Sequence, residues 1–260
     1  MNLNLNNKYA LVCGSTAGIG KATAIALAQE GVQVTLIARN EDKLKATLAE
    51  LPQQRAHDYI VADFSNPNEL KQNVSAYISK KHGFHILVNN TGGPKGGPVF
   101  LAEVEEFENA FTQHLKCNHV LAQVVVPYMK TEGFGRIINV ISTSVKQPLD
   151  GLGVSNTIRG AVANWSKTLA NELGQFGITV NNVLPGATGT ERLTEIIKNK
   201  SAKTGKTEDE AANAMKQAVP AKRFAKPEEL AYAITFLASE CASYINGINL
   251  PVDGGRTKSL

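Results

Sequence analysis

Residues 8–20 have the sequence KYALVCGSTAGIG, which limits the folds that the chain can adopt. Residues 8–13 form a short apolar run rich in residues that favour β-structure, so they predict a buried strand. Three glycines at 14, 18 and 20 follow, and residues 21–30 are good helix formers. A strand, a glycine turn and a helix in this order suit a dinucleotide phosphate, because glycine permits close backbone approach and a helix N-terminus offers free N–H groups. We therefore expect a cofactor to contact Gly14, Ser15, Thr16, Gly18, Ile19 and Gly20.

The spacing of these glycines, with three residues and then one residue between them, differs from the common Gly-x-Gly-x-x-Gly fingerprint. Three glycines also gather in ordinary turns, which is the alternative interpretation. Their position at the first strand-to-helix junction favours nucleotide binding over a plain turn.

Composition and charge restrict the class of protein. With 260 residues and 43% hydrophobic content, the chain can bury a sizeable core, and we expect one domain over residues 1–260. The net charge of +4 is spread along the chain without a basic run, so neither nucleic-acid nor membrane binding is expected. Cys13, Cys117 and Cys241 lack metal-ligand spacing, which predicts reduced, buried thiols and no metal site. The absence of a signal-like start or a long apolar segment predicts a cytoplasmic protein.

Strand-like and helix-like stretches alternate along the whole chain. This alternation predicts an α/β fold of the Rossmann type, with a doubly wound parallel sheet of about seven strands and helices on both faces. Pro127 can break the long helical stretch 103–130, and the polar stretch 187–220 is expected to form a substrate flap. Strands are expected at 8–13, 32–38, 58–62, 85–89, 136–141, 178–184 and 244–252, and further helices at 41–51, 67–81, 152–174 and 227–239.

The carboxyl ends of the strands are where open α/β sheets bind ligands, so residues there are candidates for chemistry. After the second strand the sequence is Ala38-Arg39-Asn40. An acid would accept a ribose 2′-OH and an arginine accommodates a 2′-phosphate, so NADP(H) is favoured, with NAD(H) as the alternative cofactor. Arg39 as a merely solvated charge is the other interpretation. Asp63 and Phe64 follow the third strand, where Asp63 either hydrogen-bonds adenine or caps a helix.

Five motifs in the same order resemble those of the short-chain dehydrogenases/reductases, over essentially the whole chain. The glycine turn is similar to TGxxxGxG, with Cys13 where the family has Thr. Residues 89–92, NNTG, resemble NNAG, residues 185–190 resemble PGxxxT, and the stretch from Arg223 to DGG at 253–255 resembles the family's ending. The resemblance implies the Rossmann-type fold and dinucleotide binding. It adds to the cofactor-binding residues Asn90, Thr91, Gly92, Pro185, Gly186, Thr188 and Thr190.

The family's catalytic set of Asn, Ser, Tyr and Lys is only partly present. Laying the family's GRIINxSS pattern on residues 135–142 puts its serine at Ser142. The register of the following helix puts the family's Tyr at Ser155 and its Lys at Arg159, which would contact both substrate and cofactor. The Asn position falls on His114, with Asn118 as the alternative. The overall pattern looks like a divergent subgroup labelled β-ketoacyl-ACP reductase-like.

These substitutions change the available acid chemistry. A serine hydroxyl is a much weaker acid than a phenol, and an arginine stays protonated. His114 can supply a proton, or it is a histidine hydrogen-bonded inside its helix interface. Two hypotheses follow: an NADP(H)-dependent oxidoreductase for a small carbonyl or alcohol with an altered proton donor, or a dinucleotide-binding protein without redox chemistry.

Two further features of the sequence concern regions outside this set. A literal YxxxK occurs at 77–81, on the helix before the fourth strand, and we interpret it as chance because that helix should lie away from the cofactor. The resemblance also implies a homo-oligomer, most often a tetramer, assembled through the long helices after the fourth and fifth strands. The apolar residues that favour this are Val124, Val125, Val126, Val154, Ala161, Val162 and Trp165.

Overall fold

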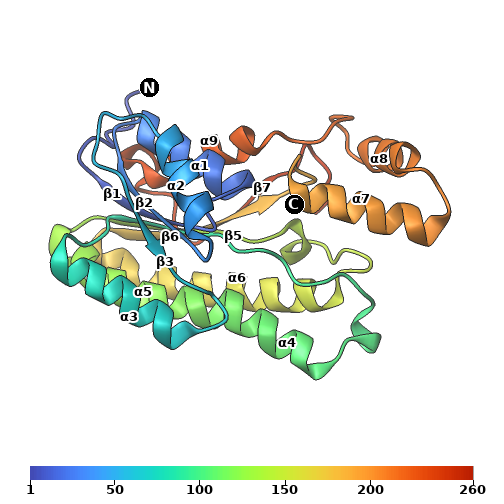
Figure 1. Cartoon of the computed structure of the whole chain (residues 1–260), viewed down its shortest axis with the longest axis horizontal. Helices are drawn as coiled ribbons and strands as arrows, with labels where there is room; N and C mark the ends of the chain where they lie inside the picture. The colour runs from blue at the N-terminus through green and yellow to red at the C-terminus, as the bar shows by residue number, and fades with distance from the viewer. Residues whose placement is uncertain (260) are drawn as a thin grey trace.

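A sheet of seven parallel strands organises residues 1–259, the part of the chain that the computed structural model describes (Figure 1). The strand order is β3-β2-β1-β4-β5-β6-β7, so the winding direction reverses between β1 and β4. Ligands of open α/β sheets bind at such a reversal. The predicted Rossmann-type fold is therefore confirmed. The strands are β1 (Tyr9–Cys13), β2 (Gln33–Ala38), β3 (Asp58–Val61), β4 (Ile86–Asn89), β5 (Gly135–Val140), β6 (Ile178–Pro185) and β7 (Asn249–Val252).

Helices cover both faces of this sheet. Successive side chains of each strand point to the two faces in turn, so both faces contribute to a buried core. In β1, Ala10 and Val12 face α1 (Gly18–Gln29), α2 (Glu41–Glu50) and α9 (Pro227–Ala238). Leu11 and Cys13 face the opposite core with α3 (Pro67–Lys80), α5 (Cys117–Glu132) and α6 (Gly153–Leu173). Burial on both sides explains why the strands are continuous apolar runs.

The long helical stretch after β4 departs from the predicted break at Pro127. Pro127 is exposed and lies inside α5, which continues to Glu132. The irregularity falls earlier, where a π-helical turn, Thr112–Lys116, joins α4 (Val104–Phe111) to α5. A π turn widens the helix by one residue and is frequent at functional sites. It places His114 in the interior.

The predicted flap consists of two helices that project beyond the sheet (Figure 1). Thr190 caps α7 (Glu191–Thr204), and Thr207 begins α8 (Glu208–Gln217) with a reciprocal capping box. Each of the two helices buries a single residue, Leu193 and Ala211. Their stability therefore depends strongly on local capping.

Three further expectations concern the cysteines, the last strand and membrane-spanning helices. Cys13 and Cys117 are buried, but Cys241 is exposed in a surface turn, so the prediction of three buried thiols is wrong for Cys241. The last strand begins at Asn249 and not at 244, because the preceding residues form a loop in which Tyr244 is fully exposed. Within residues 1–259, no helix is long and apolar enough to cross a membrane.

Two histidines accept hydrogen bonds from the backbone near the amino ends of β1 and β2. His85 Nδ1 accepts the backbone N–H of Tyr9 at 3.1 Å, and His57 Nδ1 accepts that of Val34 at 3.0 Å. Both hydrogen bonds require an unprotonated Nδ1. Burial, the largest cause in each case, lowers the pKa of both imidazoles below the usual value of 6.5. The folded state therefore binds fewer protons than the unfolded chain just below neutral pH.

The free energy of unfolding should consequently fall as the pH is lowered from 7.5 to 5.5. The unfolded chain takes up protons near pH 6.5, whereas the folded histidines resist protonation, so stability is lost on acidification. Urea unfolding at the two pH values measures this loss. The double variant His57→Asn/His85→Asn, whose amide oxygens can accept the same N–H groups without titrating, should lose less. An equal pH dependence in both proteins would contradict the assignment.

Candidate active site

The glycine turn is held against the end of β4 by Asn90. The amide of Asn90 donates to the carbonyl oxygens of Gly14 and Cys13, at 3.3 and 3.4 Å. Gly14 has a φ of +57°, and a Cβ there would lie 2.4 Å from the carbonyl oxygen of Asn90. A Cβ on Gly20 would lie 2.2 Å from the carbonyl oxygen of Gly14. Both positions therefore require glycine for the close backbone approach that the sequence predicts.

The N-terminus of α1 opens directly beyond this turn. Ala17 precedes the helix without a side-chain cap, and the first turn contains no acidic residue. Its N–H groups are thus available to a phosphate, and the residues present fit a dinucleotide in this cradle. Ser15 is an exception among the predicted contacts, because its buried hydroxyl accepts the N–H of Ile37 at 3.1 Å. That side chain ties the turn to β2, and Ser15 as a whole is buried beneath the turn.

Arg39 and Asp63 lie near one another beyond the carboxyl ends of β2 and β3. Arg39 is exposed, and none of the ion pairs within residues 1–259 involves it. Asp63 accepts the N–H of Ser65 at 2.8 Å, and this hydrogen bond, followed at smaller size by the charge of Arg39, holds its pKa below the usual value. The helix cap is Asn66, so the capping alternative for Asp63 is wrong. The carbonyl of Phe64 accepts the thiol of Cys117 at 3.1 Å.

Ser142 and Arg159 both lie at the carboxyl end of β5. Arg159 is buried on α6, and its Nη1 donates to the carbonyl of Val140, the last residue of β5, at 3.1 Å. Ser142 follows two residues later, and its Oγ accepts the N–H of Ser144 at 3.1 Å. This hydrogen bond occupies a lone pair of Ser142 and leaves its hydroxyl proton free to donate. Ser155, half-buried, lies one helical turn before Arg159 on α6.

His114 reaches the same region from the π turn. Its Nδ1 lies 2.6 Å from the hydroxyl of Thr91, which follows β4, while its buried Nε2 has no partner. Burial, and then the charge of Arg159, lower the pKa of His114 to about 2. The imidazole is therefore neutral at physiological pH, which agrees with the interpretation of a histidine hydrogen-bonded within its helix interface. Asn118, the alternative position, is also buried, one turn further along.

The residues after β6 mainly stabilise the chain. Thr188 donates to the carbonyl of Gly186 at 3.1 Å, and Thr190 caps α7. A Cβ on Gly186 would lie 2.7 Å from the Cα of Asp253, so this glycine is required by packing against the turn after β7. Thr190 also lies beside the glycine turn, because a Cβ on Gly18 would meet its methyl group at 3.0 Å. Pro185 ends β6 on the same edge of the sheet. A Cβ on Gly92, in contrast, would project into open space.

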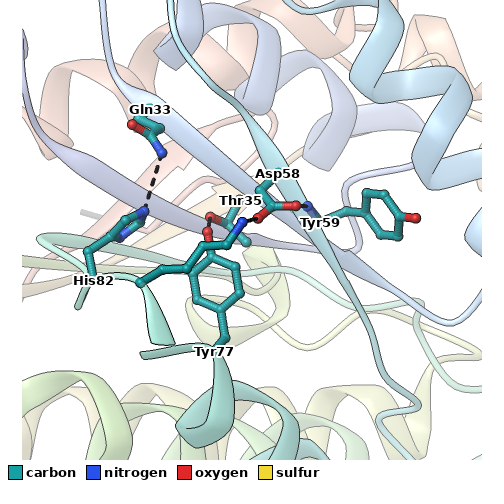
Figure 2. Close-up of polar contacts among 7 residues, drawn as sticks. Gln33, Thr35, Asp58, Tyr59, Tyr77 and His82 are labelled. Carbon is teal, nitrogen blue, oxygen red and sulfur yellow. Dashed lines mark hydrogen bonds and ion pairs between the residues drawn. The ribbon is translucent and has the colours of Figure 1, made fainter. Parts of the chain in front are cut away.

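The literal YxxxK lies at the opposite edge of the sheet. Figure 2 shows Tyr77 reaching Thr35, whose hydroxyl is 3.1 Å away, with Asp58 beside them. Lys81 forms an ion pair with Asp58, the first residue of β3. These contacts belong to the amino-terminal halves of β2 and β3, away from Arg39. The interpretation of this motif as chance agrees with its position.

One contact of the site was not predicted from the sequence. Arg192, near the start of α7, donates to the carbonyl of Pro94 at 2.6 Å and so joins the flap to the loop 91–98. The same loop is joined to the start of α6, because the N–H of Gly97 donates to the carbonyl of Gly151 at 2.8 Å. No spacing rule predicts which flap residue meets this loop.

Comparison with known proteins agrees with this geometry. Residues 14–257 match the family described as enoyl-(acyl carrier protein) reductase, and the curated relatives extend the match over nearly the whole chain. The chain belongs to the short-chain dehydrogenase/reductase family. Glucose 1-dehydrogenase of Gluconobacter oxydans is 35% identical, over 96% of this chain and 92% of the relative. The 3-oxoacyl-(acyl-carrier-protein) reductase FabG of Staphylococcus epidermidis is 31% identical, over 96% and 98%.

The solved structures of this family include a similar protein with bound ligands. The L-sorbose reductase from Gluconobacter frateurii, complexed with NADPH and L-sorbose, superimposes with a TM-score of 0.93 at 32% identity. The alignment covers 100% of both chains. Members of the short-chain dehydrogenase/reductase family thus share the fold of this chain from end to end.

Proposed function

We propose that this chain is an NADP(H)-dependent oxidoreductase acting on a small carbonyl compound or the corresponding alcohol. Ser155 and Arg159 occupy the positions of the family's Tyr and Lys, and Ser142 retains its own. The observation that carries the proposal is the convergence at one edge of the sheet of the Asn90-held glycine turn and the Ser142–Arg159 pair. Residues 1–260 act as one domain, with 187–220 as the substrate flap. The contact of Arg192 with Pro94 supports that role.

NADPH, when bound, supplies a hydride to the carbonyl carbon. The N–H groups at the start of α1 hold its phosphates, and Arg39 holds the 2′-phosphate. Arg39 suits this role because it is exposed and enters no ion pair within the described chain, whereas an acid at this place would repel the phosphate. The NADPH found in the similar L-sorbose reductase supports the same preference.

We therefore expect NADP(H) to bind more tightly than NAD(H), and Arg39→Ala to remove most of the difference. A charge-assisted hydrogen bond is worth about 1.5–3 kcal/mol, which corresponds to roughly ten- to 150-fold in affinity. Calorimetric titration of both cofactors into both proteins measures it. Lys43→Ala, which removes another charge from the start of α2, serves as the matched control and should keep the preference. Equal affinities for the two cofactors in the unmutated protein would refute the assignment.

The side chains around the proposed carbonyl position are better suited to polarising the substrate oxygen than to donating a proton to it. The free hydroxyl proton of Ser142 can donate to that oxygen, and the Arg159 cation stabilises negative charge developing there. His114 carries no imidazolium proton at neutral pH. The remaining proton donors are Ser155 and an ordered water, and both are weaker acids than the family's phenol.

A second candidate function is a dinucleotide-binding protein that has lost redox chemistry. The replaced Tyr and Lys favour it, as does the low pKa of His114. Steady-state NADPH oxidation with ketones, aldehydes and acyl-thioester mimics separates the two candidates. Turnover of any of these compounds supports the oxidoreductase, and tight NADPH binding without turnover supports the binding protein.

Restoring the family's pair should raise the rate of carbonyl reduction. The double variant Ser155→Tyr/Arg159→Lys supplies a phenol and the amine that tunes it, and general acid catalysis typically contributes about 10² to 10⁴ in rate. Arg159→Lys alone should do little, because no phenol is present for the lysine to tune. Initial rates of NADPH oxidation with the best ketone measure the gain.

A brisk rate in the unmutated protein would make His114→Ala the informative control. Loss of that rate with NADPH binding preserved would assign the proton donor to His114. A rate that survives both His114→Ala and Ser155→Ala would contradict our choice of donors among side chains and leave water.

We also propose that the chain assembles as a homotetramer, as the resemblance to its family implies. Its basis is narrower than the sequence suggests, because Val125, Val154 and Val162 are buried within the chain itself. The helices after β4 and β5 still leave Val124, Val126, Ala161 and Trp165 partly exposed. These residues are the surface that a second copy would cover.

A further inference from the structure

The guanidinium of Arg159 is a buried cation without a counter-charge in its own chain. The side chain is 7% exposed, and Nη1, bonded to Val140, is the one nitrogen that donates to another residue within 1–259. Nε is buried and has no partner. None of the ion pairs within this part of the chain involves Arg159.

The other buried arginine of the described chain shows what a structural role looks like. Arg136 donates to the carbonyls of Ser239, Gly135 and Gly177, and the carboxylate of Glu240 favours its charge. Its donors thus hold strand ends and a helix end together. Arg159 has a single carbonyl and no acid to favour its charge. The structural contacts of Arg136 therefore explain why a buried arginine is present there. Most of the hydrogen-bonding capacity of Arg159, in contrast, is unused.

An unpaired buried charge is costly, so a ligand that neutralises it gains much of that cost back on binding. Burial lowers the pKa of Arg159 to about 10, which still leaves the group protonated at neutral pH. The neighbouring His114 is neutral and supplies no negative charge. In the proposed function the phosphates of the cofactor lie at α1 and Arg39, and a ribose hydroxyl carries no charge. The anion has to come from elsewhere.

On this basis, which rests on the proposed function, we propose that the substrate is a small oxo acid, or the corresponding hydroxy acid, whose carboxylate binds Arg159. Nη1 is the one guanidinium nitrogen that donates within the described residues, and Nε is buried without a partner, so the group keeps unused donors for a charge-assisted hydrogen bond to a carboxylate. The hydroxyl of Ser142, at the same strand end, then donates to the oxygen that reacts. Arg159 thereby selects substrates by charge, because a neutral ketone has no carboxylate for it to bind.

Two pairs of compounds that differ only in charge test this assignment. Acetoacetate with acetoacetamide, and pyruvate with pyruvamide, replace a carboxylate by a neutral amide of the same shape. Calorimetric titration is made into the unmutated protein with NADP⁺ present, because a ketone and the oxidised cofactor do not turn over. We expect the acid of at least one pair to bind tenfold or more tightly than its amide. Equal affinities within both pairs overturn the proposal.

Variants separate Arg159 from the general charge of the protein. Arg159→Met should abolish the preference for the acid, Arg159→Lys should retain part of it, and Lys95→Gln, in the exposed loop 91–98, should leave it unchanged. Thermal unfolding shows whether Arg159→Met is folded, and we expect an unchanged or higher Tm because an unpaired buried charge is removed. A preference that survives in folded Arg159→Met overturns the proposal. The acid–amide comparison in the unmutated protein needs no variant.

The same titrations separate this proposal from the proposed function. A preference for the acid that is present without NADP⁺ and disappears with it means that the cation serves the cofactor, which overturns the proposal. Turnover of neutral ketones at the same efficiency as oxo acids leaves the proposed function standing and also overturns the proposal. A preference for the acid without oxidation of NADPH by any carbonyl supports the anion site and removes the reductase function.

Discussion

The hydrogen bonds from Asn90 to the carbonyls of Cys13 and Gly14 are the contacts on which the site depends. They join the end of β4 to the first glycine turn, across the point at which the strand order reverses. The turn passes so close to Asn90 and to itself that a side chain at Gly14 or Gly20 would collide with backbone. This close approach leaves the N-terminus of α1 open, and it sets Thr91 in position for His114.

From that point the polar groups form a connected series along the carboxyl edge of the sheet. Thr91 meets His114 in the π turn, the charge of Arg159 contributes to keeping His114 neutral, and Arg159 is fixed to the end of β5 beside Ser142. In the proposed function, a hydroxyl and a guanidinium take the places of the family's phenol and amine. On that proposal the site lacks an acid of suitable strength and keeps a permanent positive charge. Such a site favours the recognition of negative charge over the delivery of protons.

Much of this arrangement could be predicted from the sequence, because it depends on patterns that are local. The glycine spacing, the apolar runs and the strand–helix alternation predicted the fold and the edge of the sheet that matters. Counting from two fixed motifs placed Ser142 and Arg159, and the structure brings both to the end of β5.

The features that sequence reasoning missed depend on tertiary packing. The π turn at 112–116 places His114 in the interior, and Pro127 lies on the exposed side of α5 within a continuous helix. The hydrogen bond from the Ile37 N–H to the Ser15 hydroxyl joins segments that are distant in the sequence, and so does the contact of Arg192 with Pro94. Neither periodicity nor spacing carries information about such pairs.

The most direct test of a working reductase at this edge of the sheet is isotope transfer. The protein is incubated with NADPH deuterated at its hydride-donating carbon and with a panel of oxo acids and neutral ketones, and the products are examined by mass spectrometry. We predict an alcohol product with one deuterium on the carbon that was the carbonyl. Bound NADPH together with no deuterium in any product would contradict the account.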